Sequence, residues 1–116
     1  LDGIPGIVLP STQEGTDCVW NQYTIQVTHD GTLDCTEPRR DRVRQGLLEH
    51  GVQSMVYYPL PLHRQPVYAP LNYRIAQLPL ADRAALEVLS LPMFPELTLL
   101  EQEQVRNSLK DVLIGC

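Results

Sequence analysis

The side chains best suited to chemistry gather in one stretch of the chain. Tyr57 and Tyr58 end an apolar run, and His63 follows within a proline-rich segment. Tyrosine hydroxyls and an imidazole can hydrogen-bond a polar ligand, and a histidine can also transfer protons near neutral pH. A lone loop histidine is more often a surface or capping residue, and tyrosines at a strand end usually pack on a core. Taken singly, these residues therefore favour a structural role.

No established catalytic constellation occurs elsewhere. The sequence has no Ser-His-Asp set, no phosphate-binding loop and no group of metal ligands. Asp82 opens a predicted helix, where a negative charge near the N-terminus is favourable without any catalytic role. The proline-punctuated segment 59–79 is the best local candidate for a binding role, because loops longer than about 15 residues are uncommon unless they are functional. We therefore expect no metal site in the chain.

The charge pattern argues against nucleic acid and membrane partners. The net charge is −5, whereas nucleic-acid-binding proteins usually carry a basic stripe. The nearest candidate is a run of arginines among acidic residues, which favours a solvated helix face over a phosphate-binding patch. These arginines are Arg39, Arg40, Arg42 and Arg44. No run of about 18 apolar residues exists, so no membrane span is predicted.

Three widely spaced cysteines, Cys18, Cys35 and Cys116, indicate the cellular compartment. Their odd number and the lack of a Cys-x-x-Cys pair argue against a zinc site. We expect three reduced thiols in a cytoplasmic protein, although one pair could form a disulfide in an isolated fragment. The first residues do not resemble a signal peptide, and the missing initiator methionine suggests a fragment or a processed chain.

The amino-terminal half predicts an extended segment, a strand and a helix. Residues 1–17 are rich in Gly, Pro, Ser and Thr and should form an extended segment that enters the domain. Residues 19–28 alternate between a mostly apolar and a mostly polar set, which predicts a strand with one face on a core. A turn over 29–32 follows, and then a helix over 38–50 with Thr36 as its N-cap.

The carboxy-terminal half predicts two further strands and two helices around the loop. These are a strand over 52–58, a helix over 80–89 and a short strand over 90–93. A proline confines the short strand to an edge of the sheet, because proline cannot donate to a central ladder. The last helix is marked by a capping box from Thr98 to Glu101.

This order of elements predicts an α+β fold. We expect a small antiparallel sheet of about three strands, packed on one face by about three helices. The length of 116 residues fits one domain. In that domain, residues 18–116 fold as a unit after the extended segment 1–17.

Several motifs, read in order, carry a family resemblance. The most specific are Tyr-Tyr-Pro-Leu-Pro-Leu-His over 57–63 and Leu-Ser-Leu-Pro-Met-Phe-Pro-Glu-Leu-Thr over 89–98. The segments Asn-Gln-Tyr-Thr-Ile over 21–25, Arg-Asp-Arg over 40–42 and His-Gly-Val over 50–52 accompany them. Together they resemble the C-terminal part of the DegT/DnrJ/EryC1/StrS aminotransferases, also called sugar aminotransferases. The resemblance covers nearly the whole chain.

The resemblance implies the small domain of an enzyme with the aspartate-aminotransferase fold. Such enzymes transfer an amino group, often from glutamate, to a keto-sugar attached to a nucleotide. Their cofactor is pyridoxal phosphate, held as a Schiff base on a lysine of the large domain. The resemblance also implies a cytoplasmic homodimer, whose active site lies at the subunit interface and is closed in part by the small domain.

The only lysine, Lys110, is a poor candidate for the Schiff base. That role needs a buried lysine beside a cofactor pocket. Lys110 lies next to Asp111 on the predicted terminal helix, which favours a solvated charge. We therefore expect no catalytic residue and no bound cofactor in this chain, and we expect it to be inactive alone.

The resemblance places substrate contacts at Tyr57, Tyr58, His63 and Asn21. The segment 57–63 would face the active-site cleft as a lid. Many relatives have His-Tyr-Pro where this chain has Tyr57-Tyr58-Pro59, Glu where it has Asp82, and His where it has Asn21. The first and third differences leave the particular sugar open.

A second class of function also fits the sequence. The chain could be a stand-alone module that binds a small ligand or another protein and has no catalytic activity. In either case, a small domain without its large partner would expose apolar surface. The predicted places are the Trp20 side of the first strand and the proline-rich loop 59–79.

Overall fold

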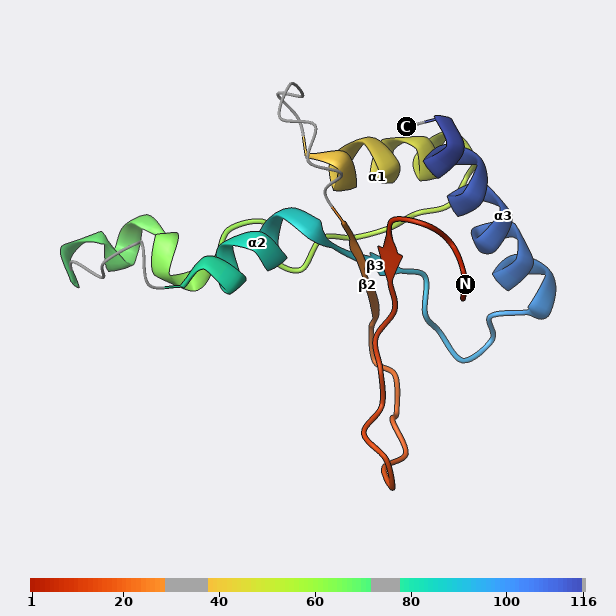
Figure 1. The fold of residues 1–116 in the computed structure, drawn as a ribbon, viewed down its shortest axis with the longest axis horizontal. Helices are drawn as coiled ribbons and strands as arrows, with labels where there is room; N and C mark the ends of the chain where they lie inside the picture. Colours follow the sequence, from red (N-terminus) through yellow and green to blue (C-terminus); the bar gives the residue numbers. More distant parts are fainter. Residues whose placement is uncertain (29–37, 72–77, 116) are drawn as a thin grey trace.

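The computed structural model describes residues 1–28, 38–71 and 78–115 (Figure 1). Within these residues the chain forms three strands, three α-helices and two 3₁₀ helices. In chain order they are β1 (Ile7–Val8), β2 (Tyr23–Val27), α1 (Arg39–Glu49), η1 (Leu62–Arg64), η2 (Pro66–Leu71), α2 (Pro79–Glu87), β3 (Val88–Leu91) and α3 (Leu99–Gly115). The predicted α+β class is confirmed.

The sheet is antiparallel throughout, with β2 between β1 and β3. The predicted strand over 52–58 is wrong, because this segment touches the sheet only through an isolated bridge between Met55 and Ser90. The third strand is instead β1, within the predicted extended segment, whose Ile7 pairs with Val27. Strand β3 is only four residues long, and Pro92, which follows it, has no amide hydrogen to donate. The outer edge of β3 therefore offers few backbone groups with which a further strand could pair.

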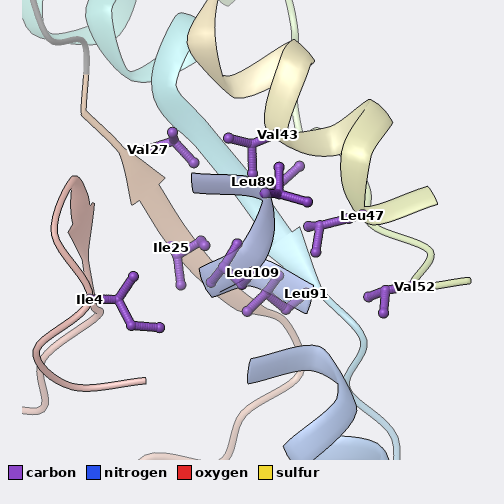
Figure 2. Packing of buried hydrophobic residues seen from close by; sticks show 10 residues of the cluster. Ile4, Ile25, Val27, Val43, Leu47, Val52, Leu89, Leu91 and Leu109 are labelled. Carbon is purple, nitrogen blue, oxygen red and sulfur yellow. The ribbon is translucent and has the colours of Figure 1, made fainter. Parts of the chain in front are cut away.

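The core lies on one face of β2, as the alternation predicts. Ile25 and Val27 are buried, while Thr24 and Gln26 point to the opposite face. Figure 2 shows the apolar side chains of β2 and β3 meeting those of α1 and α3. Each fully buried side chain contributes roughly 1.5–3 kcal/mol relative to its exposed state. The helix residues in this cluster are Val43 and Leu47 of α1 and Leu109 and Val112 of α3.

Helices α1 and α3 approach closely at Gly46. A Cβ atom added there would lie 2.7 Å from Cγ1 and 2.8 Å from Cγ2 of Val112. Val112 is buried, and a β-branched side chain in a helix has essentially one rotamer available. The contact between the two helices therefore requires a residue without a side chain at position 46.

Arg40 is buried, contrary to the expected solvated face. The residue is only 4% exposed, and its Nη1 donates to the backbone carbonyls of Ala85 (3.1 Å) and Val88 (3.0 Å). Its Nε donates to Asp41 Oδ1 at 2.7 Å. Carbonyls in the last turn of a helix lack intrahelical partners. Arg40 supplies donors to these carbonyls and so connects the start of α1 to the junction of α2 with β3.

Helix ends differ from the predicted bounds where tertiary pairing intervenes. Helix α2 ends at Glu87 rather than Leu89, because Val88 and Leu89 pair with β2. The capping box of α3 is confirmed: the Thr98 amide donates to Glu101 Oε2 (2.8 Å), and the Glu101 amide donates to Thr98 Oγ1 (3.3 Å). The predicted turn over 29–32 and the predicted N-cap at Thr36 lie outside the described residues.

The molecule is more extended than a compact domain of its size. Its radius of gyration is 15.9 Å, against about 13 Å for a compact chain of this length. One projection is the arm, defined as residues 59–71 and 78–87, which extends away from α1 and α3 (Figure 1). Seven large apolar side chains of the arm are exposed, and five of them lie in the proline-rich loop 59–79, as predicted. They are Leu60, Leu62, Val67, Leu71, Leu78, Leu80 and Leu86.

Replacing Gly46 by Ala should destabilise the chain. Alanine is the better helix former by about 1 kcal/mol, but the clash with Val112, which typically costs about 1–3 kcal/mol, should outweigh this and give a net loss of up to about 2 kcal/mol. Urea unfolding of Gly46→Ala measures the difference. The matched control is Gly115→Ala, where the added Cβ meets open space. Equal stability of both variants and the wild type would contradict this close approach.

Removing the guanidinium of Arg40 should also destabilise the fold. Arg40→Met keeps much of the side-chain length but leaves two carbonyls without donors, at a cost of about 1–3 kcal/mol in unfolding free energy. Arg40→Lys should lose less, because an ammonium can still donate. The control is Arg44→Met on the exposed side of α1. If both Met variants unfold at the same urea concentration, the proposed tie between α1 and α2 is wrong.

Candidate functional site

A small hollow brings two of the predicted site residues together. Asn21 and Tyr57 both line a hollow of about 210 Å³ beside the outer edge of β3. We call this the polar hollow, because most of its lining side chains carry amides or hydroxyls. The complete lining is Asn21, Gln22, Gln53, Ser54, Met55, Tyr57, Ser90, Leu91, Pro92 and Met93.

Backbone pairing fixes the walls of the polar hollow. Asn21 lies two residues before β2, and β2 is held between β1 and β3. Segment 53–57 is joined to β3 by two hydrogen bonds, from the Met55 amide to the Ser90 carbonyl (2.9 Å) and from the Ser90 amide to the Met55 carbonyl (2.7 Å). The Ser90 hydroxyl lies 2.8 Å from that of Thr24. The isolated bridge at Met55 therefore holds Tyr57 beside β3.

The two tyrosines are in contact, but they differ in exposure. Their ring centroids lie 5.9 Å apart with an interplanar angle of 74°, an edge-to-face arrangement. Tyr57 is 41% exposed and lines the polar hollow, whereas Tyr58 is 76% exposed and does not. The peptide bond between them is cis. Both rings thus remain available to a ligand or a neighbouring domain.

His63 is separated from this group and packs within the arm, against α2. Its side chain is 8% exposed, and its Nε2 lies 3.1 Å from Oδ1 of Asp82 on α2. The ring nitrogen is buried and makes no well-aligned hydrogen bond within the described residues. His63 does not line the polar hollow. The structure therefore joins Asn21 with Tyr57, places Tyr58 beside Tyr57, and leaves His63 apart.

Asp82 connects η1 to α2 electrostatically. Its carboxylate accepts two hydrogen bonds from the Arg64 guanidinium, to Oδ1 at 2.5 Å and to Oδ2 at 2.7 Å. The hydrogen bonds from Arg64 lower the pKa of Asp82 below its ordinary value, and the contact with His63 acts in the same direction. Asp82 is thus held in its charged form and fixes η1 against the first turn of α2.

A larger groove adjoins the polar hollow and shares Asn21 with it. This aromatic groove, of about 920 Å³, includes Trp20 and Tyr23, whose ring centroids lie 5.1 Å apart. Phe94 and Arg106 also line it. Sequence reasoning indicated apolar exposure on the Trp20 side. It missed Gln22, Gln53 and Ser54 in the polar hollow, and no signal in the sequence distinguishes these common polar residues.

The position of Lys110 bears on the expectation about the cofactor. Lys110, the only lysine, is partly buried on α3 rather than fully solvated as expected. It follows buried Leu109 and lines neither the polar hollow nor the aromatic groove. The described residues contain no group of three potential metal ligands and no helix long and apolar enough to cross a membrane. Of the cysteines, Cys18 is exposed as a free thiol, and Cys35 and Cys116 lie outside the described residues.

Comparison with known proteins identifies the family to which this α+β domain belongs. The DegT/DnrJ/EryC1/StrS aminotransferase family matches residues 1–110. The chain belongs to this family. It spans about a quarter of the length of the relatives it matches.

Three relatives illustrate the similarity. A pleiotropic regulatory protein of Geobacillus stearothermophilus is 48% identical over 99 residues, which are 85% of this chain and 24% of the relative. A dTDP-3-amino-3,4,6-trideoxy-alpha-D-glucose transaminase of Streptomyces venezuelae is 40% identical over 97 residues, which are 84% of this chain and 23% of that enzyme. The crystal structure of NtdA from Bacillus subtilis, with bound cofactor PMP, has a TM-score of 0.70 and 34% identity, covering 95% of this chain and 23% of NtdA.

Asp82→Asn should lower thermal stability at neutral pH but not in acid. Because the pKa of Asp82 is lowered in the folded chain, its contribution is present above the ordinary aspartate pKa and is lost as the pH falls through the folded value. The unfolding temperatures of the variant and the wild type should differ at about pH 7 and approach each other progressively as the pH falls below the ordinary aspartate pKa of about 4. The difference should be modest, because solvent screens this ion pair.

The control for this comparison is Asp111→Asn, which removes an exposed carboxylate from α3. It should change the unfolding temperature little at either pH. A difference for Asp82→Asn that persists unchanged in acid would show that the carboxylate charge is not what stabilises the arm.

Proposed function

We propose that this chain is the C-terminal small domain of a pyridoxal-phosphate-dependent aminotransferase that aminates a nucleotide-linked keto-sugar. Residues 18–116 form the domain, and segment 1–17 leads into it and supplies β1. The domain contributes an active-site lid and substrate contacts. The Schiff-base lysine and the pyridine-binding groups belong to a large domain outside these residues.

One observation carries the proposal. Nearly the whole chain matches the aminotransferase family, and a 40% identical relative is named as a transaminase of a dTDP-linked sugar. NtdA, whose structure holds PMP, supports the cofactor, since PMP is the aminated form of pyridoxal phosphate. The lack of a suitable lysine in this chain fits a role that leaves the cofactor to another domain.

The exposed surface supports docking onto a larger body. The chain exposes 8517 Å², whereas a compact monomer of 13.1 kDa exposes about 6,400 Å². The excess of about 2,100 Å² matches the area that large and permanent interfaces bury. Seven of the exposed large apolar side chains lie on the arm. We propose that the large domain covers it in a cytoplasmic homodimer.

Within this proposal the polar hollow provides the substrate contacts. Asn21 and Tyr57 share it and can hydrogen-bond sugar hydroxyls. Tyr58, exposed beside Tyr57, would contact the sugar or the nucleotide once the domains meet. His63 would complete the lid, with Asp82 and Arg64 fixing its position on the arm.

Substitutions in the complete protein test the proposal. Asn21→Ala and Tyr57→Ala should each lower kcat/KM for amination of the keto-sugar nucleotide by about tenfold or more, because polar groups of the substrate lose partners. Amino transfer from glutamate is the measurement. Asn107→Ala, an exposed residue of α3, is the matched control and should retain wild-type values.

Two results would count against the proposal in different ways. Unchanged kinetics in both variants would remove the polar hollow from the substrate site. No amination of any keto-sugar nucleotide by the complete protein would reject the enzymatic role. It would favour the stand-alone interaction module that the exposed arm also fits.

A further inference from the structure

We propose that the polar hollow selects an uncharged sugar ring over one that carries a carboxylate or a phosphate. This inference rests on the proposed function and refines its substrate class. It predicts that the sugar bound beside Asn21 and Tyr57 is a neutral hexose or an amide-substituted hexose. The observation behind it is the chemical composition of the hollow.

The polar groups of the hollow are carboxamides and hydroxyls. Three are carboxamides, on Asn21, Gln22 and Gln53, and the others include the hydroxyls of Ser54 and Tyr57. Each carboxamide offers both donors and an acceptor, and each hydroxyl can do either. Sugar hydroxyls have the same dual character. The Ser54 oxygen is buried and has no partner within the described residues, so the wall keeps spare hydrogen-bonding capacity.

Apolar groups complete the fit to a pyranose. Leu91, Pro92 and Met93 line one side of the hollow, and the ring of Tyr57 lies in its lining. A pyranose presents C–H groups on its faces and hydroxyls around its edge. The hollow has apolar and aromatic groups beside amides and hydroxyls, so its lining can match both parts of a pyranose. Such a combination is typical of ligand pockets, in which a few polar groups orient the ligand.

Charge gives the selectivity. None of the ten residues that line the hollow is acidic, basic or histidine. A carboxylate or phosphate placed there loses water and gains no cation, and this is costly even where neutral hydrogen bonds are available. The net charge of −5 adds to the penalty. A neutral ring suffers none of these losses.

The arginines of the two adjoining hollows do not alter this conclusion. Arg42 and Arg44 line a hollow of about 830 Å³, which shares Gln53 and Ser54 with the polar hollow. Asp41 and Glu49 line that same hollow and offset their charge.

The aromatic groove, which shares Asn21 with the polar hollow, also holds an arginine, Arg106. Glu103 lines the same groove and offsets its charge.

Matched ligands test the inference with the complete protein. UDP-glucose and UDP-glucuronate differ only in the carboxylate, and the dTDP-linked pair repeats the comparison with the other nucleotide. Titration calorimetry should give a dissociation constant at least about tenfold lower for the neutral member of a bound pair. In Gln53→Arg this preference should shrink or reverse, because a cation then faces the hollow. Gln104→Arg, an exposed residue of α3, is the control and should keep the preference.

The possible results distinguish a failure of the neutral-sugar inference from a failure of the proposed nucleotide-sugar function. Equal or tighter binding of glucuronate by the wild type would overturn the neutral-sugar inference while leaving the nucleotide-sugar function in place. An unchanged ratio in Gln53→Arg would also overturn it. Failure of every sugar nucleotide, and of UDP and dTDP themselves, to bind would reject the proposed function and the inference together.

Discussion

Strand β2 constrains nearly everything else in this chain. Its side chains alternate strictly, so one face must be buried and the other can carry polar pairs such as Thr24 with Ser90. A shift of one residue along its partners would exchange the two faces and expose the core. Because the register with β3 is fixed, the positions of Asn21 before β2 and of Met55 beside β3 are fixed as well.

Polar and charged groups attach the arm to this core at the C-terminal end of α2. Arg40 donates to the Ala85 carbonyl there, and the Gln26 amide of β2 donates to Glu87. Ala85 is buried beside these contacts, whereas seven large apolar side chains of the arm are exposed. Within the arm, Asp82 joins α2 to η1. The arm is therefore held in a defined position and still exposes apolar side chains.

Local patterns determined which parts of the structure could be predicted. The alternation of β2 and the capping box at Thr98 are readable because their causes lie within a few residues. Strand β1 and the burial of Arg40 depend on partners about 20 and 45 residues away, so composition suggested the wrong environment. The resemblance named both Asn21 and Tyr57 as substrate contacts, but no periodicity places them side by side, and only the fold shows that they line one hollow.

The excess surface has a thermodynamic consequence. Folding of this chain removes less surface from water than folding of a compact domain with the same number of residues. Both the heat-capacity change and the denaturant slope of unfolding scale with that surface. The heat-capacity change should therefore fall below the roughly 1.4–1.7 kcal/mol/K typical of 116 residues. The stability curve of the isolated domain should therefore be flatter than that of a compact domain of the same length.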